Sequence, residues 1–183
     1  MANSTVPLIE LTIRKALPDD AANLATLSLQ VWLHNYAREG ISSIISEYVL
    51  NEFTEEKFRV RIGNAVTTFF LGEVITNRVT NLVGFARLDV QSVCPVPTGS
   101  AVQLSTLYVQ EPFVHRGVGT ALLAHAETWA GSQGTPQLWL TVNAQNHRAL
   151  AFYAKHHYQK IGVTPFRLGD IDHENHVLIG GGP

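Results

Sequence analysis

The chain has 183 residues, of which 45% are hydrophobic and 15% charged, and its formal net charge is −2. This length and composition predict one compact domain over residues 1–183, and they argue against extended disorder and against sequence-independent binding of nucleic acid, which needs many basic side chains. Cys94 is the only cysteine, so no internal disulfide can form and nothing demands an oxidising compartment.

The N-terminal third of the sequence predicts one strand and three helices. Alternating apolar residues indicate a strand over residues 9–14. Pro18-Asp19-Asp20 then favours the start of a helix that runs to Gly40. A short helix is expected over residues 41–50, and Thr54-Glu55-Glu56 is typical of the capped start of a third helix.

From Val66 onward the sequence predicts strands separated by two helices. β-Branched and aromatic residues indicate the strands, and apolar residues at helical spacing indicate the helices. The expected strands are 67–75, 82–90, 101–109, 138–142, 158–163 and 176–179, and the expected helices are 118–129 and 146–156. The polar Thr76-Asn77-Arg78 segment indicates a hairpin. This order of elements predicts a mixed α/β fold on one central sheet.

Two glycines, Gly117 and Gly119, open the helix that follows the strand ending at Val109. Backbone N–H groups at a helix start are unpaired and bind anionic oxygens, and glycine lets a phosphate approach them closely. The segment lacks the lysine of a P-loop, and residue 122 is leucine instead of the third glycine of a dinucleotide-binding turn. By itself it indicates either another kind of anion site or a tight turn before a packed helix.

Two segments of the C-terminal half carry a more specific pattern. The first is Leu107-Tyr-Val followed by Val114-His-Arg-Gly-Val-Gly119, and the second is Asn146-His-Arg-Ala-Leu-Ala-Phe-Tyr153 after a short strand. Together they resemble the GNAT superfamily of acyl-CoA N-acyltransferases, with Val114 where Gln or Arg is usual. The Phe166-Arg-Leu-Gly-Asp170 segment looks like the ending of the spermine/spermidine-type branch.

The resemblance implies an α/β (α+β) fold: a GNAT-type single domain with a central mixed, mostly antiparallel sheet of about seven strands flanked by helices. The acyl-CoA-binding core would span about residues 66–164. The resemblance also implies that acetyl-CoA is the cosubstrate and that no metal takes part, and that two chains pair as a homodimer through their C-terminal strands.

The resemblance assigns roles to particular residues. Asn146 would hydrogen-bond the pantetheine arm, Tyr153 would be the catalytic acid that protonates the leaving thiolate, and a backbone N–H near Tyr108 or Val109 would stabilise the negative carbonyl oxygen. The expected cofactor contacts are Leu107, Tyr108, Val109, Val114, His115, Arg116, Gly117, Val118, Gly119, Thr120, Asn146, Ala149, Phe152, Tyr153 and Lys155.

The sequence says less about the acceptor side. Trp32, Tyr36 and Asp89 are the expected substrate contacts, although aromatic residues at helical spacing also serve as core. Five acidic residues are candidates for receiving a cationic substrate: Glu39, Glu47, Asp89, Asp170 and Asp172.

The base that activates the amine is open. Many members of the superfamily carry a glutamate on the strand before the glycine turn, but the aligned residues 103–105 contain no carboxylate. Glu73, Asp89, His34 and a water relay are the alternatives.

We therefore expect an N-acetyltransferase that passes the acetyl group of acetyl-CoA directly to a small primary amine in a ternary complex, with polyamines as one candidate. The alternatives are acetylation of a protein or peptide amine or an antibiotic, or a non-catalytic acyl-CoA-binding sensor. The N-terminal residues lack a signal-peptide pattern and no apolar run approaches the length of a membrane span, so we expect a cytoplasmic protein without membrane contact.

Overall fold

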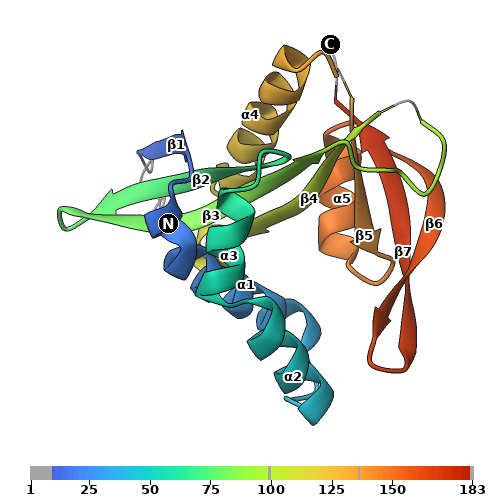
Figure 1. Ribbon diagram of the computed structural model, residues 1–183, viewed down its shortest axis with the longest axis horizontal. Helices are drawn as coiled ribbons and strands as arrows, with labels where there is room; N and C mark the ends of the chain where they lie inside the picture. Colours follow the sequence, from blue (N-terminus) through green and yellow to red (C-terminus); the bar gives the residue numbers. More distant parts are fainter. Residues whose placement is uncertain (1–9, 99, 136, 182–183) are drawn as a thin grey trace, which may run out of the picture.

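The computed structural model describes residues 10–98, 100–135 and 137–181 (Figure 1). Seven strands form one sheet in the order β1-β2-β3-β4-β5-β7-β6. Their bounds are β1 (Leu11–Lys15), β2 (Thr67–Thr76), β3 (Val79–Val90), β4 (Val102–Val109), β5 (Leu138–Asn143), β6 (Gln159–Leu168) and β7 (Ile171–Gly180). Neighbouring strands are antiparallel except β4 and β5, which are parallel. The expected mixed, mostly antiparallel sheet of seven strands is confirmed.

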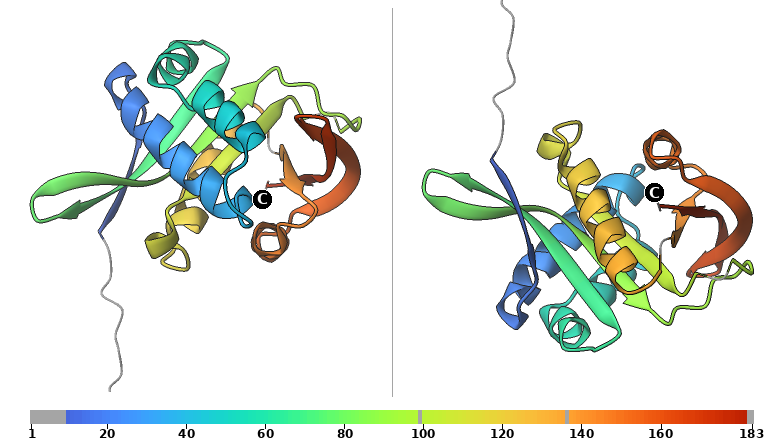
Figure 2. Two further views of the ribbon diagram at one scale, coloured as in Figure 1. Left: turned by 90° about the horizontal axis from the view of Figure 1, so that it is seen from below. Right: turned by 90° about the horizontal axis from the view of Figure 1, so that it is seen from above.

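Helices cover both faces of this sheet (Figure 2). They are α1 (Ala21–Tyr36), α2 (Ser43–Glu52), α3 (Glu55–Ile62), α4 (Val118–Ser132) and α5 (His147–Lys155), with short 3-10 turns η1 (Pro18–Asp20) and η2 (Glu111–Phe113). Side chains along β3 point alternately to the two faces of the sheet, and this explains why a helical layer covers each face. Phe85 packs with α1 and α3, while Ala86 and Leu88 pack with α4 and α5. None of the described helices is both long and apolar enough to cross a membrane.

Capping side chains set where three helices begin. Ser42, Thr54 and Asn146 accept hydrogen bonds from the backbone N–H groups of Ile45, Lys57 and Ala149, at 3.3, 3.2 and 3.1 Å. The predicted start at Thr54 is therefore confirmed, and the second helix begins later than residue 41 because Ser42 is its cap.

The first predicted elements have different ends in the structure. The first helix ends at Tyr36 instead of Gly40, since the next residues take non-helical dihedrals. The first strand begins at Leu11, while Ile9, where we placed its start, lies outside the described residues.

The two hairpins are longer than the sequence predicted. Asn77 and Arg78 have φ of 52° and 65°, the paired positive dihedrals of a tight two-residue turn, so β3 begins at Val79 instead of residue 82. β6 and β7 likewise extend beyond the predicted 158–163 and 176–179 to a turn at Gly169. Polar residues near both turns interrupt the apolar alternation that marked the strand centres.

Strands β4 and β5 separate along the sheet. They pair only at Gln103 and Trp139, whereas β4 pairs with β3 along its whole length. The edge of β4 beyond Gln103 therefore has no strand partner on its β5 side, and an opening interrupts the sheet there. This opening positions the candidate site.

Candidate functional site

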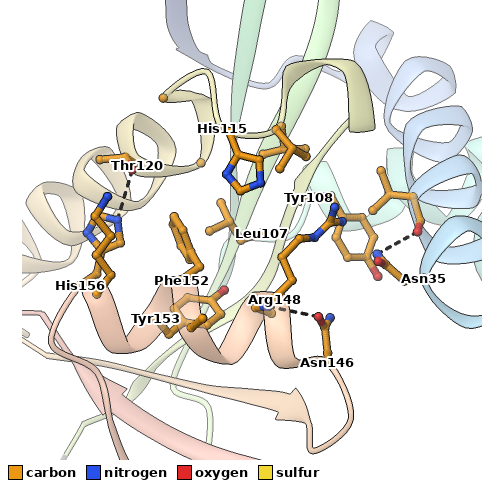
Figure 3. A pocket seen from close by; sticks show the side chains of 18 of the residues that line it. Asn35, Leu107, Tyr108, His115, Thr120, Asn146, Arg148, Phe152, Tyr153 and His156 are labelled. Carbon is orange, nitrogen blue, oxygen red and sulfur yellow. Dashed lines mark hydrogen bonds between the residues drawn. The ribbon is translucent and has the colours of Figure 1, made fainter.

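A cavity of about 600 Å³ lies at the opening, bordered by β4, the loop before α4, and α5 (Figure 3). It collects every expected cofactor contact except Arg116 and Val118. The expected residues that line it are Leu107, Tyr108, Val109, Val114, His115, Gly117, Gly119, Thr120, Asn146, Ala149, Phe152, Tyr153 and Lys155. We call it the donor cavity.

Packing explains why Arg116 and Val118 do not line the donor cavity. The Val118 side chain is fully buried in the core beneath α4. The Arg116 guanidinium lies 5.7 Å from the centroid of the Phe113 ring, and its buried Nε has no hydrogen-bond partner among the described residues. The Arg116 backbone N–H donates to the Phe113 carbonyl oxygen, so of the two residues only Val118 has a backbone N–H to offer a ligand.

The start of α4 has the backbone geometry of a turn that can bind an anion. His115 and Gly117 have φ of 63° and 84°, and Ala121 is the first residue of the helix whose N–H bonds back to a carbonyl, that of Gly117 at 2.9 Å. The N–H groups of residues 118–120 are thus unpaired within the helix. A Cβ added at Gly119 would lie 3.5 Å from the Phe152 ring, inside the cavity mouth. Glycine there keeps the turn open to an anion.

The backbone of β4 presents a donor to the opening. The Gln110 N–H donates to the Val83 carbonyl at 2.9 Å, and Tyr108 is the Cα partner of Phe85. Because alternate residues of an antiparallel strand bond the same neighbour, the Tyr108 N–H points to β3 and the Val109 N–H points into the opening. Of the two expected oxyanion donors, only the Val109 N–H points away from β3 and can donate to a ligand in the opening.

Helix α5 presents Asn146 and Tyr153 to the opening (Figure 3). The Asn146 side-chain oxygen caps the helix, which leaves its amide N–H groups for a ligand. The Tyr153 side chain reaches from α5 toward Leu107, and Tyr153 is only 7% exposed. Burial raises the pKa of the Tyr153 phenol well above its usual range, so the hydroxyl stays protonated at neutral pH.

The prediction missed two basic residues of the donor cavity, Arg148 and His156. Arg148 Nη1 donates to both carboxylate oxygens of Glu111, at 3.0 and 2.7 Å, and His156 Nε2 lies 3.2 Å from Thr120 Oγ1. They stand four residues before and after Phe152, so helical spacing from an expected contact was the signal that pointed to them.

A second cavity of about 300 Å³ adjoins the first and shares Tyr36, Leu107, Tyr108, Asn146, Ala149 and Tyr153 with it. We call it the acceptor cavity. Its other lining residues are Ser28, Trp32, Tyr48, Glu52, Phe53, Phe58, Phe85, Arg61, Arg87, Leu104, Ser105, Thr106, Thr141, Val142, Asn143, Phe166 and Asn175. The expected substrate contacts Trp32 and Tyr36 both line it, and Asp89 does not.

Asp89 instead supports a residue that does line the acceptor cavity. Its carboxylate accepts hydrogen bonds from Thr67 Oγ1 at 2.7 Å and from Ser105 Oγ, and it pairs with Arg87 Nη2 at 2.8 Å. Because the Ser105 proton is committed to Asp89, the Ser105 oxygen presents only lone pairs to a ligand. Ser105 is one of residues 103–105, where many members of the superfamily carry a glutamate. Here the nearby negative charge is the Asp89 carboxylate on the neighbouring strand, β3.

The other candidate bases lie elsewhere. Glu73 accepts hydrogen bonds from Arg14 Nε and Nη2 at 2.9 and 2.6 Å, and His34 Nε2 lies 3.3 Å from Glu111. Neither Glu73 nor His34 lines either cavity. None of the five acidic residues proposed for a cationic substrate does so, and the one carboxylate among the described lining residues of the acceptor cavity is Glu52. Within the described ranges, no three His, Cys, Asp or Glu side chains gather as a metal site.

Residues 31–158, more than half of the chain, match the model of the acetyltransferase (GNAT) family. An uncharacterized N-acetyltransferase of Mycobacterium tuberculosis is 35% identical over 78 residues, which are 43% of this chain and 50% of the relative, so the chain spans about half the length of that relative. The spermidine N(1)-acetyltransferase of Thermoplasma acidophilum is 24% identical over 93% of this chain and 96% of its own length.

A solved structure shares the fold. The crystal structure of the PaiA N-acetyltransferase of Thermoplasma acidophilum in complex with coenzyme A superposes with a TM-score of 0.71, at 21% identity, over 94% of this chain and 99% of that one. The spermidine N(1)-acetyltransferase relative agrees with the branch that the Phe166–Asp170 segment resembles, and the solved structure shows the shared fold.

Proposed function

Because the chain belongs to the GNAT family of acetyltransferases, we propose that it transfers the acetyl group of acetyl-CoA to a primary amine. The observation that carries this proposal is the pair of adjoining cavities, which share Leu107, Tyr108 and Tyr153 at the opening between β4 and β5. The donor binds in the larger cavity and the amine in the smaller one, so that the two reactants meet beside Tyr153.

The residues around the donor cavity fit acetyl-CoA. The unpaired N–H groups of residues 118–120 bind the pyrophosphate, and the glycine at position 119 leaves room for it. The Asn146 amide donates to the pantetheine arm. Four basic side chains surround this cavity and attract the negative phosphates: His115, Arg148, Lys155 and His156.

The acceptor amine loses a proton before it attacks, because a free alkyl ammonium has a pKa of about 10.4. The Ser105 oxygen accepts an N–H of the amine, and Asp89 is a positioning residue that fixes the direction of the Ser105 hydroxyl. The neutral amine nitrogen then bonds to the thioester carbon. As the carbon–sulfur bond breaks, the nitrogen gives up its second proton through water, and this proton replaces the one that Tyr153 gives to the thiolate. This role for the Asp89–Ser105 pair replaces Glu73 and His34 as candidates.

Two groups stabilise the negative charge that develops during transfer, one at the carbonyl oxygen and one at the sulfur. The Val109 N–H donates to the carbonyl oxygen as it becomes negative. As the carbon–sulfur bond breaks, the Tyr153 hydroxyl donates its proton to the leaving thiolate, and the high pKa of the buried phenol keeps that proton in place until then.

A polyamine is one candidate acceptor, which the spermidine N(1)-acetyltransferase relative supports. Location in the cytoplasm and pairing of two chains remain predictions from the sequence.

Release of free thiol from acetyl-CoA, measured with and without a panel of primary amines, tests the proposal. We expect thiol release that depends on the amine. Tight binding of coenzyme A without any amine-dependent release would contradict it and would favour the non-catalytic sensor instead.

A further inference from the structure

The charged side chains of the acceptor cavity carry information about the acceptor. Of the described residues that line it, Glu52 is the only carboxylate, and Arg61 and Arg87 bring two guanidinium groups. Cationic side chains thus outnumber the anionic one on the wall that the acceptor contacts.

The Glu52 carboxylate is already neutralised. It pairs with Arg61 Nη2 and with Lys57 Nζ, the latter at 3.3 Å. A polyamine carries a positive charge on each protonated nitrogen, so it would meet three cations, Arg61, Arg87 and Lys57, that are paired with only two carboxylates, Glu52 and Asp89. Like charges in a half-buried site repel each other more strongly than in water, and the cavity is therefore a poor host for a polycation.

The two guanidinium groups keep unused donors. Arg87 pairs with Asp89 through Nε and Nη2, at 3.2 and 2.8 Å, and Arg61 pairs with Glu52 through Nη2. Each guanidinium carries five N–H donors. Among the described residues no hydrogen bond engages Nη1 of either arginine, so the Nη1 groups remain for an oxyanion, which guanidinium binds in a planar, bidentate manner.

Aromatic packing holds both arginines on the same side of the cavity. The Arg61 guanidinium lies 5.4 Å from the Phe58 ring centroid, and the Arg87 guanidinium lies 6.0 Å from that of Phe69. The Phe58 and Phe69 rings are 5.9 Å apart, so one aromatic cluster carries both groups. Contact with an aromatic face restricts a guanidinium and lowers the entropy that it loses on binding.

Part of the cavity wall is aromatic. Trp32 lies 4.8 Å from Tyr36 and 4.9 Å from Tyr48, measured between ring centroids, and Tyr48 contacts Phe166 edge-on. These rings offer an apolar surface against which the body of a substrate can pack between the reacting amine and the arginines.

We infer that the acceptor is an amine whose far end carries a carboxylate or a similar oxyanion, which Arg61 and Arg87 bind through their Nη1 groups. The inference rests on the proposed function and deepens it, because it names the substrate class of the same site. The amine points toward Tyr153 and Ser105, and the anionic end points toward α3 and β3.

A matched amine panel tests the inference. The aromatic set is 4-(aminomethyl)benzoate, 4-methylbenzylamine and 1,4-bis(aminomethyl)benzene, and the aliphatic set is 6-aminohexanoate, hexylamine and 1,6-diaminohexane. In the better set we expect kcat/KM for the amino acid to exceed both other values by at least about tenfold, the size typical of charged hydrogen bonds. Equal values for the three members, or a preference for the diamine, would overturn the inference.

Substitutions of Arg61 and Arg87 test whether these side chains cause the preference for the carboxylated amine. Arg61→Met and Arg87→Lys should each cut the ratio of kcat/KM for the carboxylated amine to kcat/KM for the neutral amine by about tenfold. Arg87→Lys keeps the charge beside Asp89, so it avoids leaving that carboxylate unpaired. Arg59→Met is the matched control, because Arg59 lies on the same helix, pairs with Glu55 at 2.7 Å and does not line the cavity. An unchanged preference in both cavity variants would contradict the assignment.

A binding measurement separates the inference from the proposed function. Calorimetry on the coenzyme A-loaded protein should detect 4-methylbenzoate binding that Arg61→Met weakens by about tenfold. If this binding is present but no amine releases thiol, the anion subsite stands and the acetyltransferase proposal fails. If 4-methylbenzoate does not bind while neutral amines are acetylated, the anion subsite is wrong and the acetyltransferase proposal stands.

Discussion

The donor and acceptor cavities meet at one opening in the sheet, yet the chain builds them in different ways. The donor cavity draws mostly on two continuous stretches, residues 107–120 and 146–156, and offers backbone N–H groups as well as side chains. The acceptor cavity takes one to five residues from each of many elements on both sides of the opening. Backbone N–H groups in a short stretch suit a cosubstrate that stays the same when side chains change. Side chains from separate elements can be substituted one at a time, so they suit the selection of the acceptor.

The largest expected effect is a loss of kcat on substitution of Tyr153, which lines both cavities where they meet. Tyr153→Phe removes the proton donor for the thiolate and should lower kcat by about 100- to 10,000-fold. The KM for acetyl-CoA should change little, since the ring remains in place. Steady-state kinetics over a range of pH measures both constants.

Tyr158→Phe is the control for Tyr153. The Tyr158 hydroxyl donates to Glu127 Oε1 at 3.0 Å, and Tyr158 lines neither cavity, so this variant should keep its activity. Full activity of Tyr153→Phe at every pH would remove Tyr153 from the mechanism.

A smaller effect belongs to the donor cavity alone. Gly119 lines the donor cavity, and a Cβ there would make ordinary contact with the Phe152 ring and take up space that we propose for the pyrophosphate. Gly119→Ala should therefore weaken coenzyme A binding about tenfold, the loss of about one charged hydrogen bond, without lowering the thermal midpoint. Calorimetry and thermal unfolding give the two quantities.

Gly131→Ala is the matched change on the same helix. A Cβ there meets nothing within 4 Å, so this variant should gain up to about 1 kcal/mol of helix stability and bind coenzyme A as the wild type does. Equal coenzyme A affinity in the two variants would show that the turn at Gly119 does not hold the pyrophosphate.

The acceptor side should respond to a single hydroxyl. Ser105→Ala removes the acceptor for the amine N–H and should raise the KM for the amine about two- to tenfold, the range for one hydrogen bond, with an unchanged KM for acetyl-CoA. Ser92→Ala is its control, because Ser92 Oγ donates to Gln103 Oε1 at 2.8 Å and lines neither cavity. An effect on acetyl-CoA instead of the amine would place Ser105 on the donor side.

A change outside both cavities should alter stability alone. The hydrogen bond from Arg14 holds the pKa of Asp20 below its usual range, so Asp20 stabilises the fold at neutral pH. This stabilisation is complete above the unfolded value of about 3.9 and is lost as the pH falls through the lowered folded value. Asp20→Asn should cost about 1–3 kcal/mol at pH 7 and less at pH 3, with unchanged acetyl transfer.

Thermal unfolding between pH 7 and pH 3 measures the loss at Asp20. Asp19→Asn is the neighbouring control, because the Asp19 side chain is fully exposed. A parallel decline of all three proteins would show that Asp20 does not contribute, and a loss of activity in Asp20→Asn would bring the Arg14–Glu73 network back into the mechanism.

The sequence predicted the fold and the donor side for the same physical reason. Strand centres and buried helix faces repeat with a period of two or of 3.6 residues, and the glycine turn and the Asn146 cap act through nearby backbone. Such signals lie within a few residues of each other, so one sequence reveals them. The side chains of Arg116 and Val118 do not line the donor cavity, and the burial of Val118 follows from the periodicity of α4.

The acceptor side depended on information that the sequence does not carry locally. Arg87 is the Cα partner of Thr106 and Leu88 that of Leu104, so Ser105 is the extra residue of a β-bulge. Only this register brings Ser105 beside Asp89. Arg61 reaches the same cavity from α3, which the sequence places far from β3 and β4. Asp89 was already a candidate, but without the strand register it could not be linked to Ser105, and neither arginine could be placed beside it.

We propose that the opening between β4 and β5 holds acetyl-CoA, with its acetyl group between the two cavities. A crystal structure of the protein with acetyl-CoA tests it most directly. We expect the pyrophosphate on the N–H groups of residues 118–120, the carbonyl oxygen at the Val109 N–H and the sulfur beside the Tyr153 hydroxyl. Density for the coenzyme away from this opening, or an acetyl group pointing away from Tyr153, would contradict it.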